Sequence, residues 1–162
     1  MNYFELFELP IGPVADKQVL SKKYIQLQRQ NHPDYHVGSN ELYQQDALDN
    51  SANINAAYKT LKDDQATLAY FLQIKGYLSA EDKYELPQTF LMEMMDLNEE
   101  LSFMTKQEAS EMIEKHENQL LSTVLDILNQ PTADYTEVQF QLLRDYYFKK
   151  KYLHRILDRL TD

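Results

Sequence analysis

The two histidines of the N-terminal half are the first candidates for chemistry. His32 and His36 lie four residues apart, a spacing that places two imidazoles on one face of a helix and suits a metal ion. Pro33 lies between them and disfavours a helix there, and the neighbouring sequence supplies no third ligand. We therefore expect no metal at this pair.

A group of carboxylates is the second candidate. A di-iron helical bundle would need Glu-x-x-His pairs, but none of the four histidines has an acidic residue three positions before it. The sequence has no cysteine, no glycine-rich phosphate loop and no serine-nucleophile elbow. We therefore predict that the protein is not an enzyme, that it has no catalytic residue and that it needs no cofactor. The acidic side chains of this group are Glu93, Asp96, Glu99 and Glu100.

The tripeptide His32-Pro33-Asp34 is better suited to binding than to metal chemistry. Pro33 biases His32 away from the helical conformation, so the preceding helix should end by about Asn31. The tripeptide then lies on a surface connection between two helices, with its side chains available to a partner.

The helix expected over 17–31 must position this tripeptide. Asp16 can cap its first turn, and Leu20, Tyr24 and Leu27 recur at helical steps that predict a buried stripe. Another face is basic and polar, and it could be an ordinary solvated face or a surface that attracts an acidic partner. Its residues are Lys22, Lys23, Gln26 and Arg29.

The remaining pattern is also helical. Only three glycines and five prolines interrupt a sequence rich in helix-forming residues, which predicts an all-α fold. We expect an N-terminal helical hairpin with short flanking helices, and a C-terminal antiparallel three-helix bundle. Besides the helix over 17–31, the expected helices are 3–9, 40–62, 65–73, 90–103, 105–129 and 134–160.

The first helix of the second half carries more apolar side chains than one core face needs. Phe90, Leu91, Met94, Leu97 and Leu101 already form a buried stripe, so further methionines would extend apolar character around the helix. Methionines often line adaptable binding surfaces, although core packing is the simpler alternative for such residues.

These motifs, taken together, resemble a known family. His32-Pro33-Asp34 after a basic-faced helix, with the opening 3–10, resembles the J-domain of DnaJ-type co-chaperones. The stretch 90–101 resembles the C-terminal domain of HscB, the J-protein of iron–sulfur cluster assembly. The resemblance implies a J-domain over 1–75, a linker over 76–86 and a client-binding domain over 87–162.

The resemblance also implies two partners. A DnaK/HscA-type chaperone ATPase would bind His32, Pro33, Asp34 and the face formed by Lys22, Lys23, Gln26 and Arg29. An IscU-like iron–sulfur cluster scaffold protein would bind Leu91, Met92, Met95, Asp96 and Glu99, with Tyr146 as the nearest match to an aromatic on the last helix. Phe103 stands where the family usually has an acidic residue, so its contact is not implied.

The expected function is that of a co-chaperone that delivers the scaffold to the chaperone, stimulates its ATPase and so promotes cluster transfer. Two alternatives stay open, namely a J-protein for another client in general protein folding and a helical adaptor with no chaperone link. The net charge of −10 argues against nucleic acid and acidic membranes as partners. The lack of cysteine and of a long apolar run suggests a bacterial cytoplasmic protein.

Overall fold

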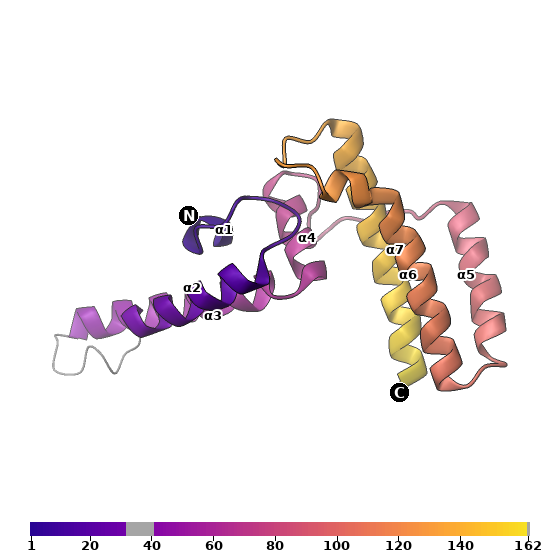
Figure 1. Cartoon of the computed structure of the whole chain (residues 1–162), viewed down its shortest axis with the longest axis horizontal. Coiled ribbons are helices and arrows are strands. Elements are labelled where there is room, and N and C mark those ends of the chain that lie inside the picture. The colour runs from indigo at the N-terminus through magenta and orange to yellow at the C-terminus, as the bar shows by residue number, and fades with distance from the viewer. Residues whose placement is uncertain (32–40, 162) are drawn as a thin grey trace. The chain divides into compact units, whose positions relative to one another are not determined.

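The computed structural model describes residues 1–31 and 41–161, and among these residues every regular element is an α-helix. The chain divides into two compact units, Met1–Ile74 and Lys75–Asp162 (Figure 1). The first unit contains α1 (Tyr3–Leu6), α2 (Lys17–Asn31), α3 (Glu41–Leu61) and α4 (Asp64–Ile74). The second contains α5 (Gln88–Leu101), α6 (Lys106–Leu128) and α7 (Glu137–Thr161).

Helix α1 is shorter than the predicted helix over 3–9. Asn2 caps it, because its side chain accepts a hydrogen bond from the Glu5 amide while Glu5 accepts one from the Asn2 amide. The helix cannot continue because Glu8 adopts a positive φ of 53°. Phe4 and Phe7 are completely buried, so tertiary packing holds this short element in place.

Helices α2 and α3 form an antiparallel hairpin (Figure 1). The predicted cap at Asp16 is confirmed, since its Oδ1 accepts hydrogen bonds from the amides of Gln18 and Val19. Across the hairpin, the Tyr24 hydroxyl donates a 2.7 Å hydrogen bond to Asn55. The Tyr24 ring also stacks on the Tyr58 ring, with centroids 4.0 Å apart.

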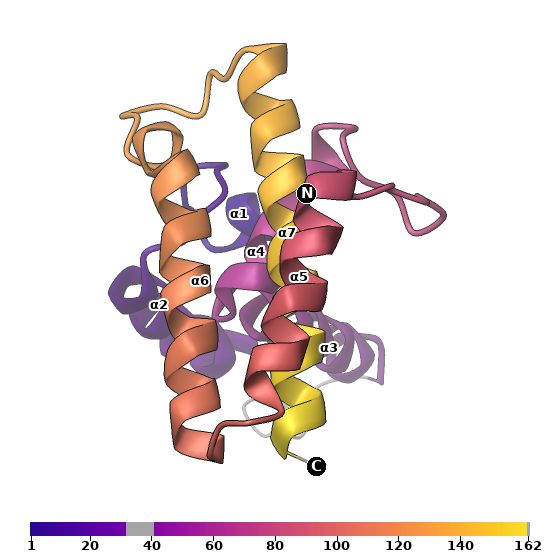
Figure 2. The same ribbon diagram turned by 90° about the vertical axis from the view of Figure 1, so that its right-hand side faces the viewer.

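The second unit is built on a bundle of α5, α6 and α7 (Figure 2). Its core combines Phe90, Met94, Leu97 and Leu101 of α5 with Ala109, Ile113, Leu153 and Ile156 of the other two helices. Thr105 caps α6, because its side chain accepts a hydrogen bond from the Glu108 amide. The apolar spacing of these three helices therefore produces one shared core.

Helix α7 starts at Glu137, three residues after the predicted start at Asp134. The side chain of Thr136 accepts a hydrogen bond from the Gln139 amide at 3.2 Å, and the Gln139 side chain accepts one from the Thr136 amide at 3.0 Å. This reciprocal pair fixes the first turn, so the helix is capped at Thr136, two residues after the predicted start at Asp134.

The segment before α5 is bound to α7 within the second unit. The Tyr77 ring stacks on Phe140 with centroids 4.4 Å apart, and the Arg144 guanidinium lies 3.4 Å from the Asp82 carboxylate. Tyr77 and Asp82, both in the expected linker over 76–86, thus contact α7. Among the described residues, no helix combines the length and apolar character that crossing a membrane requires.

Candidate protein-binding faces

Three residues on α2 form an exposed face that points away from the hairpin. Lys22, Gln26 and Arg29 are exposed and recur at steps of four and three, which places them on one side of the helix. Leu20 on the opposite side is buried, and Tyr24 contacts α3. The predicted buried stripe and the predicted basic face therefore lie on opposite sides of α2, and the exposed set is called the α2 basic face below.

Lys23 lies apart from this face. Its Nζ is 2.9 Å from the Glu8 carboxylate, and only 18% of its side chain is exposed. Lys17 is also engaged within the unit, because its Nζ donates to the Leu61 carbonyl at 3.0 Å and lies 2.8 Å from the Asp64 carboxylate. These two lysines join loops and helix ends within the first unit. Their ammonium groups are therefore less available to a partner than those of the α2 basic face.

The tripeptide His32-Pro33-Asp34 lies outside the described residues. The α2 end that precedes it is held to α3 by polar side chains. Asn31 donates to the Leu27 carbonyl and accepts a 3.3 Å hydrogen bond from Asn50. Gln28 joins the same contact, donating to Asn55 at 2.6 Å and accepting from Ser51 at 2.9 Å. These bonds fix the position from which the tripeptide departs.

Helix α5 has an exposed face directly opposite its core face. Met92 and Met95 are 58% and 64% exposed, whereas Met94 between them is 1% exposed and belongs to the core. Asp96 and Glu99 are also exposed and recur with the methionines at helical steps. We call these four residues the α5 face. Leu91 is half-buried and lies at its edge.

Tyr146 does not offer a comparable surface. It is 6% exposed, and the Lys150 ammonium lies 5.8 Å from the centre of its ring. A ring covered to this extent gives a partner little area to contact, so the burial does not support the role expected of Tyr146. Among the aromatic residues that the structure describes in this unit, Phe103 is the one that is mainly exposed, at 90%, and it follows α5 after Ser102.

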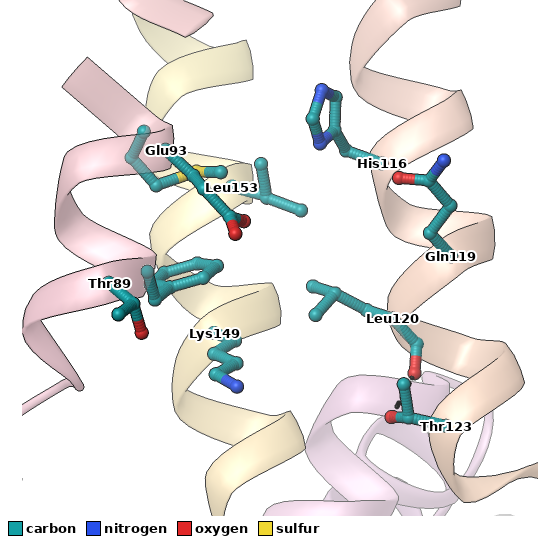
Figure 3. Close-up of a pocket in the computed structure, with 10 residues that line it drawn as sticks. Thr89, Glu93, His116, Gln119, Leu120, Thr123, Lys149 and Leu153 are labelled. Carbon is teal, nitrogen blue, oxygen red and sulfur yellow. Dashed lines mark hydrogen bonds between the residues drawn. The ribbon is translucent and has the colours of Figure 1, made fainter. Parts of the chain in front are cut away.

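A groove of about 210 Å³ lies between the three helices on another side of α5 (Figure 3). Its floor is apolar, with Leu120 and Leu153 among the lining residues, while Glu93 and His116 face each other from α5 and α6. Lys149 also lines it, but its Nζ is 2.8 Å from the Asp145 carboxylate. Among the described residues, no group of three or more His, Cys, Asp or Glu side chains lies close enough together to hold a metal ion.

Comparisons with known proteins agree with this architecture. Residues 86–161 match the family model described as the HSCB C-terminal oligomerisation domain. Three curated proteins of Vibrio cholerae serotype O1 strains, each named Co-chaperone protein HscB homolog, are 42% identical over 106 residues. These alignments cover 65% of this chain and 62% of each relative, so they span less than two thirds of the relatives' length.

Two solved structures extend the comparison to nearly the whole chain. The chaperone HscB of Vibrio cholerae aligns with a TM-score of 0.70 and 28% identity, covering 99% of this chain and 96% of that one. Human co-chaperone protein HscB aligns with a TM-score of 0.82 and 23% identity, covering 99% of this chain and 81% of that one, which shows a shared fold. The predicted all-α fold and the predicted resemblance to HscB are thereby confirmed.

Proposed function

We propose that this protein is a co-chaperone that binds an iron–sulfur cluster scaffold protein and delivers it to a DnaK/HscA-type chaperone, whose ATPase it stimulates. The observation that carries the proposal is that each unit exposes a face turned away from its own core. The α2 basic face is positive, whereas the α5 face is apolar and acidic. Two faces of different chemistry suit two different partners. The curated relatives are named co-chaperones.

The α5 face has the properties of a site for a folded protein. Met92 and Met95 provide flexible apolar surface at its centre, and Asp96 and Glu99 provide charges beside it. An apolar centre surrounded by polar groups is the usual arrangement of a protein interface. Removing an exposed methionine from water stabilises a complex by up to about 1.5–3 kcal/mol. The partner should therefore present an apolar surface flanked by basic side chains.

The α2 basic face is suited to steering an acidic partner. Lys22 and Arg29 are exposed, so an ion pair that either forms at the edge of an interface is worth only about 0.2–1 kcal/mol. Complementary charge mainly raises the association rate and fixes the orientation of the complex. In this proposal the face brings the chaperone against the tripeptide His32-Pro33-Asp34, which follows α2 in the chain.

The two faces belong to one chain, so binding of the scaffold brings it to the chaperone. Once one partner is bound, the second contact becomes effectively intramolecular, which raises the overall affinity without any new contact. The catalytic groups belong to the chaperone in this mechanism. The present chain changes which state of the chaperone is populated and acts by binding rather than by catalysis. We place this activity in the cytoplasm of a bacterium.

The test is an ATPase assay with a purified DnaK/HscA-type chaperone. The chaperone is measured alone, with this protein, with an IscU-like scaffold protein, and with both. We expect the stimulation by both together to exceed the sum of the separate effects. If an unfolded model peptide enhances the stimulation and the scaffold does not, the result would favour a J-protein for general folding. No stimulation under any condition would favour an adaptor with no chaperone link.

A further inference from the structure

Phe103 is an aromatic side chain that the structure leaves 90% exposed. Single exposed apolar residues are common on protein surfaces and need no explanation by themselves. Phe103 differs because it follows the last turn of α5 and continues the spacing of the α5 face. From Met92 the steps are three to Met95, four to Glu99 and four to Phe103.

The backbone keeps Phe103 close to helical register. The amides of Ser102, Phe103 and Met104 donate to the carbonyls three residues earlier at 3.3, 3.2 and 3.1 Å. Ser102 retains a right-handed helical conformation, and its hydroxyl donates to the Glu99 carbonyl at 2.6 Å. Bonds of this kind tighten the last turn of a helix without reversing the chain. Phe103 therefore extends the side of α5 that carries Met92 and Met95.

Resting on the function proposed above, we propose that Phe103 is a third apolar anchor of the α5 face and binds an apolar recess on the same scaffold protein. Phe103 lies eleven positions after Met92, which corresponds to roughly 16 Å along a helix. Asp96 and Glu99 lie between the methionines and the aromatic ring. The partner should therefore carry two apolar contact sites with basic side chains between them.

Three points favour the scaffold as the occupant. The ring continues a face already assigned to that partner, and the acidic residues between the anchors select a basic surface. Aromatic side chains are also enriched where interfaces concentrate their binding energy, because they combine large area with few rotatable bonds. A second copy of this chain is a less suitable occupant, because the sequence has a net charge of −10.

The experiment measures the affinity of the full chain for an IscU-like scaffold protein by isothermal titration calorimetry. We expect Phe103→Ser to weaken binding roughly tenfold or more, since most of one aromatic contact is lost, and Phe103→Leu to have a smaller effect. The matched control is Val138→Ser on α7, where the side chain is 69% exposed and lies outside the α5 face. That variant should bind within about twofold of the parent protein.

Met92→Ala separates this inference from the proposed function. If Met92→Ala weakens binding and Phe103→Ser does not, the aromatic anchor is wrong and the scaffold face stands. If neither variant weakens binding, both proposals fail. A large fall in the melting temperature of Phe103→Ser would make the ring structural. A changed oligomeric state in sedimentation with unchanged scaffold affinity would assign the ring to a second copy. Each of these last two results overturns the inference.

Discussion

The hydroxyl of Tyr84 donates a 2.8 Å hydrogen bond to Oδ1 of Asp145, which joins the segment before α5 to α7. The Tyr84 ring also stacks on Phe148 with centroids 4.6 Å apart, and the Arg144 guanidinium lies 4.8 Å from the centre of the Tyr84 ring. Burial, together with the neighbouring Asp145 carboxylate, raises the pKa of Tyr84 to about 12. This cluster fixes the residues from which α5 begins.

Tyr84→Phe should remove the hydrogen bond and keep the ring stack. We expect the free energy of unfolding near pH 8 to fall by about 1 kcal/mol, because one partly buried hydrogen bond is lost. The Asp145 carboxylate keeps its 2.8 Å ion pair with Lys149, so it is not left unsatisfied. Urea unfolding of the two proteins, followed by circular dichroism, measures the difference.

The same pair of proteins gives a prediction for pH. Because the folded-state pKa of Tyr84 is raised, its contribution is complete below the ordinary pKa near 10 and is lost as the pH rises toward about 12. The stability difference between the parent protein and Tyr84→Phe should therefore shrink between pH 10 and pH 12. A difference that stayed constant across this window would show that Tyr84 does not titrate with folding.

Met92 and Met94 offer a matched test of the α5 face, since they are two positions apart on one helix. Met94 is 1% exposed, so Met94→Ala should lower the free energy of unfolding by about 2–5 kcal/mol. Met92 is 58% exposed, so Met92→Ala should change stability by no more than about 0.5 kcal/mol. Scaffold binding in calorimetry should weaken for Met92→Ala. A large loss of stability in Met92→Ala would instead mean that Met92 packs in the core.

Much of the fold could be predicted from the sequence because its signals are local. Asp16 caps α2 as expected, since an N-cap depends on residues two or three positions away. The buried residues of α5 follow the helical period, which leaves Met92 and Met95 on the opposite side. The same period therefore predicts both the core and the exposed methionines.

Other features depend on contacts between residues far apart in the sequence. The ion pair of Lys23 with Glu8 joins α2 to the turn after α1, and helical periodicity cannot reveal it. The burial of Tyr146 likewise depends on how α7 packs. An aromatic residue at this position therefore does not by itself indicate an exposed binding residue. The start of α7 is a different case, because it is set by a local capping pattern, Thr136 with Gln139, that follows the predicted start at Asp134 by two residues.

Reversing one charge on the α2 basic face should slow association with the chaperone. Arg29→Glu changes the net charge by two units on the exposed side of α2, so the association rate should fall and its dependence on salt should weaken. The control is Lys59→Glu, the same change of charge on the exposed side of α3. Stopped-flow measurements at several salt concentrations should show a larger effect for Arg29→Glu. Equal effects would indicate that only the total charge matters.

His32→Gln should abolish stimulation of the chaperone ATPase while leaving helicity and scaffold affinity unchanged. The hairpin before this residue is held by bonds among Gln28, Ser51 and Asn55, so a substitution after α2 should not unfold it. His36→Gln is the matched control, because it makes the same substitution four residues away and should retain stimulation. Circular dichroism, calorimetry and the ATPase assay measure the three properties separately. Loss of helicity in His32→Gln would make the imidazole structural, and equal loss of stimulation in both variants would remove the special role of His32-Pro33-Asp34.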